Sequence, residues 1–418
     1  MLDCIGVEMT PVRNAWRKII MRLLFKLGSW SLVQPAIRIE LSGDLSSPDS
    51  GLDDGVDKVN SKQSSGNSGT KRVVYVLKSS EGERNPSTWK KTSVSADDST
   101  SALERFASNG GNTDFSLFTK QGLKWVNQDA MILLKNFAGQ EDVVFCGVFD
   151  GHGADGHRVA RNVRDVLPKQ LAAFWKSQEK AVKESMFSSD DSENESHDHK
   201  ERDTVGDPSV IMTWKESIIA AYRITDRELL ITDSVDSFSS GTTAVTLVKQ
   251  GNDLIIGNVG DSRAVLGTRA ADNTLLAVQL TVDLKPNIPR EADRIRRRRG
   301  RVFPIRREPH VHRVWLPDQM SPGLAMSRAL GDYCLKNHGV IAEPEVTYRR
   351  LTTNDEFVVL ATDGVWDVLS NEQVVEIVQS TSDRSQVARV IVEKAVNVWH
   401  RKNAASKVDD CAAICLFL

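Results

Sequence analysis

The 418-residue sequence has few cysteines and no long apolar run. Its five cysteines form neither a Cys-x-x-Cys pair nor a cysteine–histidine spacing typical of zinc sites. This odd, scattered set argues against a disulfide framework and indicates reduced thiols in an intracellular protein. No stretch is apolar and long enough to span a bilayer. We therefore expect the protein in the cytoplasm, the nucleus or both.

Neither sign of charge dominates the chain. It has 54 lysines and arginines against 56 aspartates and glutamates, for a formal net charge of -2. So small a net charge gives no overall attraction to nucleic acid or anionic membranes, and we expect no nucleic-acid partner. The hydrophobic content of 40% and the charged content of 26% are ordinary for a soluble globular protein.

The N-terminal segment, residues 1–41, contains a basic amphipathic helix at 10–28. Its arginines and lysines lie on one side and its apolar residues on the other. This pattern is typical of peripheral membrane contacts or calmodulin-like regulatory contacts, and equally of a helix docked on the protein's own folded domain. A transit peptide is a weaker third interpretation, because Asp3 and Glu8 are acidic.

Composition then predicts a linker followed by one folded domain. Residues 42–113 are rich in serine, glycine, aspartate and asparagine and predict a disordered polar linker. We expect the folded domain to begin near Asp114 and to cover residues 114–418. Within it, the acidic, serine-rich stretch 187–209 predicts a disordered insert.

Three short apolar runs predict consecutive strands. Thr243–Val248 and Asp253–Val259 flank a tight turn, and Ala264–Gly267 follows the turn at 260–262. Connections this short predict that all three strands are antiparallel neighbours.

Helices are predicted by apolar residues spaced four apart and by capping signals. Pro168 lies inside the first such pattern and is expected to break or restart the helix. Ser370 and Gln373 have the spacing of a capping box at the start of another helix. The first pattern consists of Val159, Val163, Leu167 and Leu171.

An arginine run, Arg294–Arg301, occupies a predicted cationic helix within 283–301. A basic run of this kind is typical of a nuclear signal or of a patch that attracts phosphate. A solvated helix face that ends at Gly300 is the simpler interpretation.

Acidic turns carry the main chemical signal. The apolar run from Val143 ends in Asp150-Gly-His-Gly, and a second apolar run ends in Asp363-Gly. Asp129 precedes a third run, and Asp409-Asp410 precedes the last. Strand-end carboxylates can converge at one edge of a sheet core, where they repel one another unless cations neutralise them. Mg²⁺ and Mn²⁺ prefer such oxygen ligands, and two bridged ions can activate a water and clamp a phosphoryl group.

With these turns in place, the sequence resembles the metal-dependent protein phosphatases of the protein phosphatase 2C family, and plant members most closely. The motifs follow the family's order over residues 114–418. The matching stretches are Phe149-Asp-Gly-His-Gly153, Gly241-Thr-Thr-Ala244, Asn258-Val-Gly-Asp-Ser-Arg263, Ser327-Arg-Ala-Leu-Gly-Asp332, Asp363-Gly-Val-Trp-Asp367 and Asp409-Asp410.

The resemblance implies an α+β fold with two packed antiparallel β-sheets, a central β-sandwich, flanked by α-helices on both sides. It implies a phosphatase catalytic domain that hydrolyses phosphoserine and phosphothreonine in phosphorylated protein substrates. The implied cofactors are two Mg²⁺ or Mn²⁺ ions per subunit and a third, weaker ion. We expect a monomer.

Roles at the metal site are carried over by motif. Asp150 would bridge the two ions, the carbonyl of Gly151 would bind one of them, and Asp363 and Asp409 would bind the other. Asp129 would act through metal-bound water. A water bridging the ions would then attack phosphorus directly, with no phosphoenzyme.

Further roles follow from the same resemblance. His152 is the implied general acid, and the alternative role is only to orient metal waters. Asp261 and Asp367 match ligands of the third ion, or else they hold the Arg263 turn and the loop after the strand. Lys124 stands where the family often has arginine, so it offers phosphate a point charge instead of a bidentate fork.

Two other functions fit parts of the sequence. A catalytically dead member could bind phosphoproteins as a scaffold, but all four metal positions are retained. A metal-dependent nuclease would explain the carboxylates and the arginines. The lack of aromatic residues interleaved with Arg294–Arg301 argues against this nuclease.

Overall fold

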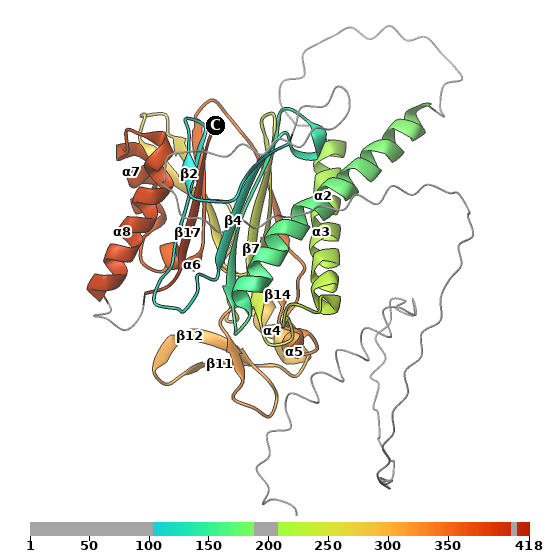
Figure 1. Cartoon of the computed structure of the whole chain (residues 1–418), viewed down its shortest axis with the longest axis vertical. Coiled ribbons are helices and arrows are strands. Elements are labelled where there is room, and N and C mark those ends of the chain that lie inside the picture. Colours follow the sequence, from blue (N-terminus) through green and yellow to red (C-terminus); the bar gives the residue numbers. More distant parts are fainter. Residues whose placement is uncertain (1–102, 188–207, 403–407) are drawn as a thin grey trace, which may run out of the picture. The chain divides into compact units, whose positions relative to one another are not determined.

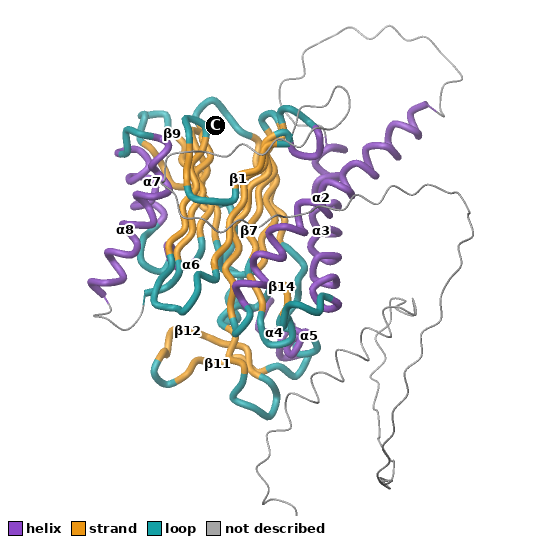
Figure 2. The backbone as a smooth tube through the Cα atoms, viewed as in Figure 1, coloured by secondary structure: helices purple, strands orange, loops and turns teal. Residues whose placement is uncertain are grey.

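The computed structural model describes residues 103–187, 208–402 and 408–418. Within them, two antiparallel sheets pack face to face, with helices on their outer faces and a small third sheet beyond one end (Figures 1 and 2). The expected α+β sandwich is confirmed. The N-terminal segment 1–41 and its predicted helix lie outside the described residues.

The first sheet has the strand order β1-β4-β5-β7-β8-β15, and the short strands β6 and β14 extend it beside β5. Every pair in it is antiparallel. Its strands are β1 (Glu104–Phe106), β4 (Asp129–Lys135), β5 (Val143–His152), β6 (Gly241–Thr242), β7 (Ala244–Gln250), β8 (Asp253–Val259), β14 (Leu330–Gly331) and β15 (Glu345–Arg350).

The second sheet has the order β10-β9-β16-β17-β3-β2, and a third sheet has the order β11-β12-β13. The second-sheet strands are β2 (Gly110–Gly111), β3 (Phe115–Lys120), β9 (Arg263–Arg269), β10 (Leu275–Gln279), β16 (Asp355–Ala361) and β17 (Cys411–Phe417). The third comprises β11 (Arg301–Ile305), β12 (Glu308–Trp315) and β13 (Pro322–Leu324).

One predicted pairing is wrong. β7 and β8 are neighbours as expected, but β9 pairs with β10 and β16 in the other sheet. The turn at 260–262 therefore carries the chain across the sandwich. Gly260 makes this turn with φ +98°, and a Cβ there would lie 2.5 Å from the Thr243 side chain.

The core lies on both faces of the first sheet. In β4, Met131 and Leu133 face the second sheet, while the alternate residues Ile132 and Leu134 face the helices. Because both faces are buried, β4 has a continuous apolar run instead of an alternating pattern.

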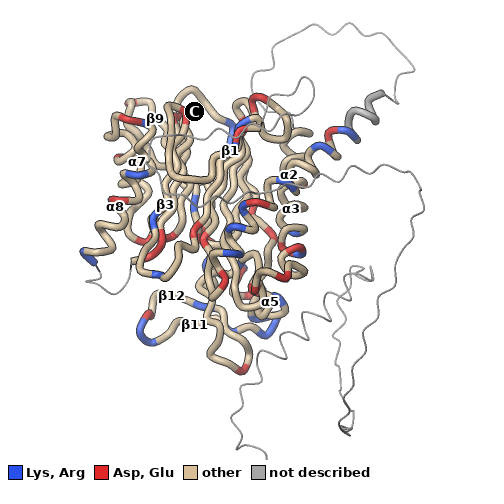
Figure 3. The backbone as a smooth tube through the Cα atoms, in the orientation of Figure 1, with Lys and Arg blue, Asp and Glu red and all other residues tan. Residues whose placement is uncertain are grey.

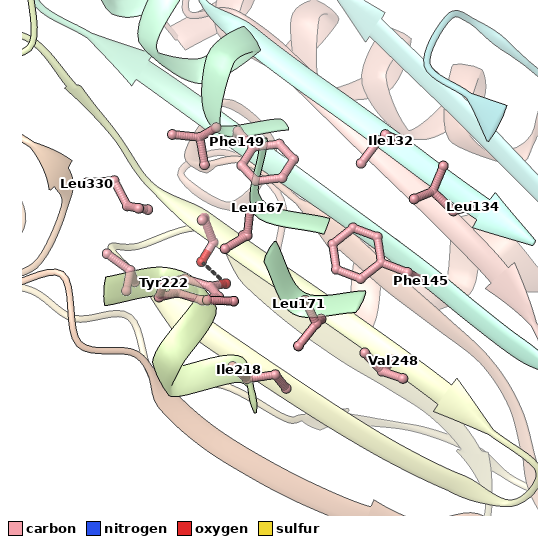
Figure 4. Packing of buried hydrophobic residues seen from close by; sticks show 14 of the residues in the cluster. Ile132, Leu134, Phe145, Phe149, Leu167, Leu171, Ile218, Tyr222, Val248 and Leu330 are labelled. Carbon is pink, nitrogen blue, oxygen red and sulfur yellow. Dashed lines mark hydrogen bonds between the residues drawn. The ribbon is translucent and has the colours of Figure 1, made fainter. Parts of the chain in front are cut away.

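Long helices cover the outer faces of the sandwich. α2 and α3 pack on the first sheet, and Figure 4 shows Leu167, Leu171, Ile218 and Tyr222 meeting strand residues there. α7 and α8 pack on the second sheet. The helices are α2 (Gly156–Phe187), α3 (Pro208–Ile231), α4 (Pro289–Arg297), α5 (Tyr333–Lys336), α6 (Asp363–Trp366), α7 (Asn371–Ser380) and α8 (Val387–Lys402), with 3₁₀ turns η1 (Phe137–Gly139) and η2 (Arg384–Gln386).

Two predictions about helices have opposite outcomes. α2 continues through Pro168 without a break. Its buried face packs on the first sheet, and this packing outweighs the low helix propensity of proline. The capping box at Ser370 is confirmed. Its hydroxyl accepts from the Gln373 N–H at 3.2 Å, and the Gln373 side chain accepts from the Ser370 N–H at 3.0 Å.

The predicted domain limits need adjustment. Among the described residues, strand pairing already includes Glu104, which pairs with Lys135, so the linker expected at 42–113 is too long at its end. α3 begins at Pro208, inside the expected insert 187–209. Residues 188–207 lie outside the described residues. No helix in the described part of the chain is both long and apolar enough to cross a membrane.

Candidate metal centre

Two of the predicted carboxylates lie directly opposite one another on neighbouring strands. Asp129, the first residue of β4, is the register partner of Asp150, near the end of β5. Like charges on facing residues of an antiparallel pair are destabilising. The strand pairing thus creates an excess of negative charge at this end of the first sheet.

The backbone around Asp150 is held rigidly. Its N–H donates to the Thr243 hydroxyl at 3.0 Å, and its carbonyl accepts from the Thr243 N–H at 2.9 Å. The next N–H, of Gly151, donates to the Gln128 carbonyl at 3.1 Å. A Cβ at Gly151 would lie 2.3 Å from the Gly156 carbonyl oxygen, so only glycine fits.

The other two carboxylates come from the second sheet. Asp363 opens α6 directly after β16, and Asp409 precedes β17. β16 and β17 are neighbours, so both carboxylates lie at the same end of this sheet. The Thr362 hydroxyl donates to Asp129 Oδ2 at 2.7 Å and joins the two sheets at this point. Figure 3 shows acidic residues gathered at the end of the sandwich that faces β11 and β12.

Electrostatics confirm that these carboxylates crowd one another. Desolvation and then the Asp363, Asp129 and Asp409 carboxylates raise the pKa of Asp150. Desolvation also raises the pKa of Asp363 to about 7, with help from Asp261 and Asp409. At neutral pH the cluster resists full ionisation, which is the condition that bound cations relieve.

Lys124 lies among the carboxylates. Its Nζ is 2.7 Å from Asp409 Oδ1 and 3.5 Å from Asp410 Oδ2. Desolvation alone would lower the pKa of Lys124, but attraction to Asp150 and Asp409 outweighs it and raises the pKa. The predicted phosphate-binding lysine is therefore a fixed positive charge within the acidic cluster.

His152 has a carboxylate partner that the sequence did not identify. Its Nε2 is 2.6 Å from Oδ2 of Asp332, which is buried. Burial lowers the pKa of His152, yet attraction to Asp332 outweighs this and raises it. A Cβ at Gly241 would lie 2.1 Å from Asp332 Oδ2, so glycine is required for the pair to form. Asp332 is the last residue of the motif that begins at Ser327. Membership of this motif was the only feature of the sequence that could have pointed to Asp332.

The segment that carries Asp332 is anchored by α4. Glu291 accepts from Arg328 at 3.0 and 2.7 Å, from the Ser327 hydroxyl at 2.7 Å and from Arg294, also at 2.7 Å. Arg294, from the predicted arginine run, is thus structural. The exposed residues 296–299 form the solvated end of a helix shorter than expected.

Asp261 and Asp367 surround a lysine that the sequence did not single out. Asp261 Oδ2 is 2.5 Å from Lys285 Nζ, and Asp367 also attracts this lysine and raises its pKa. Arg263, in the same turn as Asp261, donates two hydrogen bonds to Asp283, at 3.0 and 2.6 Å. The structural alternative for Asp261 and Asp367 stays a prediction beside the third-ion role.

The oxygen ligands at this site suit metal ions that keep several bound waters better than metal ions enclosed by protein side chains alone. Among the described residues, no three His, Cys, Asp or Glu side chains form a group that could hold a metal alone. Asp129 Oδ1 and Asp261 Oδ1 are buried and accept no hydrogen bond within the described residues. Such acceptors are costly unless satisfied. Mg²⁺ keeps several waters and uses few carboxylates, so these oxygens suit an ion with its water.

Comparisons with known proteins identify the relatives of this chain. A family model described as protein phosphatase 2C matches residues 214–404. Probable protein phosphatase 2C 33 of Arabidopsis thaliana is 52% identical over 335 residues, or 74% of this chain and 68% of that protein. Probable protein phosphatase 2C 14 of Oryza sativa subsp. japonica is 54% identical over 318 residues, or 75% of this chain and 61% of that protein.

A solved structure has the same fold. The crystal structure of serine-threonine phosphatase 2C from Toxoplasma gondii superposes with a TM-score of 0.63 at 26% sequence identity. The match covers 75% of this chain and 98% of that one.

Proposed function

This chain belongs to the protein phosphatase 2C family as a plant-type protein serine/threonine phosphatase, and from that premise we propose that its carboxylate cluster is the catalytic metal centre. The family is metal-dependent, and phosphorylated proteins are its substrates. The observation that carries the proposal is the meeting of Asp129 and Asp150 from one sheet with Asp363 and Asp409 from the other.

The chain's own residues would hold two Mg²⁺ or Mn²⁺ ions. Asp150 is electrostatically coupled to all three other carboxylates, which suits a position between both ions. The Gly151 carbonyl would bind one ion, Asp363 and Asp409 would bind the other, and Asp129 would act through water. When bound, the ions supply a water of lowered pKa and positive charge for the phosphoryl oxygens.

A third, weaker ion would use Asp261 and Asp367. Asp261 is buried with one unsatisfied oxygen, and Asp367 is exposed to solvent. Lys285 already neutralises part of their charge, which supports weaker binding at this position.

Two side chains act on the phosphate ester itself. The ammonium of Lys124 adds a fixed positive charge that attracts the phosphate as a point charge. Asp332 holds a proton on Nε2 of His152 and favours the cationic form of the ring. Nδ1 then carries the second proton, which the leaving serine or threonine oxygen can take.

The finer partner and location assignments are also proposals. The chain is proposed to act as a monomer in the cytoplasm or nucleus. Balanced charge supports the absence of a nucleic-acid partner, and reduced cysteines support an intracellular location. The basic face predicted for residues 10–28 supports a peripheral membrane or regulatory contact made by segment 1–41, outside the catalytic domain.

The test is hydrolysis of a phosphothreonine peptide by the full chain in Mn²⁺ or in chelator, with Asp150→Asn beside it. We expect turnover in Mn²⁺, none in chelator and a loss of orders of magnitude in the variant. Asp142→Asn is the matched control, because this aspartate is exposed just before the other end of β5. Normal turnover by Asp150→Asn in saturating Mn²⁺ would refute the metal assignment. A wild type that binds the peptide without hydrolysing it would indicate the scaffold function.

A further inference from the structure

A single carboxylate fixes the loop between β3 and β4. Asp410 accepts from the Gly122 N–H at 2.8 Å and from the Gln128 N–H at 3.0 Å, and it is only 1% exposed. These two donors lie at opposite ends of the loop. The loop is therefore held in one place beside the segment that brings Asp409 into the metal centre.

The loop displays an unusual residue. The Trp125 side chain is fully exposed, and Leu123 is 58% exposed. The other five tryptophans among the described residues are at most 7% exposed. An indole offers a large apolar surface at little conformational cost, and tryptophan is enriched among the residues that dominate protein recognition. A fixed and fully exposed tryptophan is thus suited to contact a partner.

The position of the loop identifies the partner. Lys124 lies between Leu123 and Trp125 in the chain, and its Nζ is 2.7 Å from the Asp409 carboxylate. A phosphate ester at the metal centre therefore lies beside this loop. Successive residues of an extended peptide are roughly 3.5 Å apart, so the neighbours of the phosphorylated residue come within reach of both apolar side chains.

We propose that Trp125, assisted by Leu123, binds an apolar side chain next to the phosphorylated serine or threonine. The enzyme then prefers phosphoproteins with an aromatic or large aliphatic residue beside the phosphosite. This specificity rests on the proposed function of the same centre. A membrane is the less suitable partner, because the Asp409 and Asp410 carboxylates lie behind the loop and two apolar residues provide little area for insertion.

The experiment compares the full chain with Trp125→Ala and Trp125→Phe on matched phosphothreonine peptides. Four positions are varied one at a time, namely the two residues before and the two residues after the phosphothreonine. Each peptide with phenylalanine at one of these positions is compared with the peptide that has alanine there. p-Nitrophenyl phosphate serves as a substrate without neighbours. For at least one phenylalanine position, we expect Trp125→Ala to lower kcat/KM roughly ten-fold through KM, and Trp125→Phe to restore most of it. Alanine peptides and p-nitrophenyl phosphate should be unaffected.

Met212→Ala is the matched control. Met212 is 50% exposed on α3, two residues from Trp214, whose indole N–H donates to Gln250 at 2.7 Å. Gln250 pairs with Val143, at the end of β5 opposite Asp150. At about 3.4 Å per strand residue, this control lies on the order of 20 Å from the centre.

Several outcomes would overturn the inference. An unchanged preference for phenylalanine in Trp125→Ala would show that the indole does not contact the peptide. An equal loss on every substrate, or a lower melting temperature, would show that it supports the protein's own structure. Loss of binding to phosphatidylcholine vesicles with intact selectivity would indicate a membrane contact. If the wild type hydrolyses no peptide at all, it is the proposed function that fails.

Discussion

Glu291 offers a quantitative test of how α4 stabilises the segment that carries Asp332. Burial alone would raise the pKa of Glu291, but hydrogen bonds from Arg328, Arg294 and Ser327 lower it from 4.5 to about 2. This difference of about 2.5 pH units corresponds to about 3 kcal/mol of stability. Because the folded-state pKa is depressed, this stability is present above pH 4.5 and is lost as the pH falls through 2.

Glu291→Gln keeps the size of the side chain and removes its charge. We expect the free energy of unfolding in urea to fall by about 3 kcal/mol at pH 7, because two arginines lose a buried counter-charge. The difference in unfolding free energy between wild type and variant should decrease by about 2 kcal/mol between pH 7 and pH 3.

The matched control is Glu343→Gln. Glu343 pairs with Arg223, and both side chains are about half exposed, so this pair should contribute about 0–1 kcal/mol at any pH. A gap below about 1 kcal/mol for Glu291→Gln at pH 7, or a gap that does not change with pH, would contradict the reasoning.

Three further predictions concern the site, a helix and the insert. Asp363→Asn should cripple turnover but recover in part at high Mn²⁺, as measured by titrating Mn²⁺ in the peptide assay, because Asp363 serves one ion only; failure to recover would place it between the ions. Ser370→Ala should cost about 1 kcal/mol in urea unfolding without changing kcat, since it removes the capping box of α7; no change in stability would mean the cap is redundant. Deletion of residues 188–203 should leave the melting temperature and peptide turnover nearly unchanged, because the composition of this stretch provides no apolar side chains for a core; a collapse of either would show that the stretch packs.

Much of the site could be predicted because its residues lie at strand ends. Acidic turns at either end of apolar runs identify Asp129, Asp150, Asp363 and Asp409, and the strand register brings the first two together. The period of the apolar residues likewise predicts the buried faces of α2 and α8. These signals are local, and the sequence carries them directly.

The parts that could not be predicted depend on contacts between distant segments. Asp332 is 180 residues from His152, and Asp410 is 288 residues from Gly122. The crossing at 260–262 involves a choice of sheet, and a turn of this length permits either a hairpin or a crossing. In α2, packing on the first sheet overrides the local effect of Pro168. Tertiary structure decides each of these cases.

The position of β17 has a consequence for folding of the chain during its synthesis. This strand is made after every other described strand, yet it lies in the interior of its sheet, between β16 and β3. A nascent chain that lacks it leaves two strand edges unpaired and has not yet positioned Asp409. Given the metal role proposed for Asp409, we expect the second sheet and the metal centre to be completed together, when β17 takes its place. For the same reason, we expect a fragment cleaved before Asp409 to have no phosphatase activity.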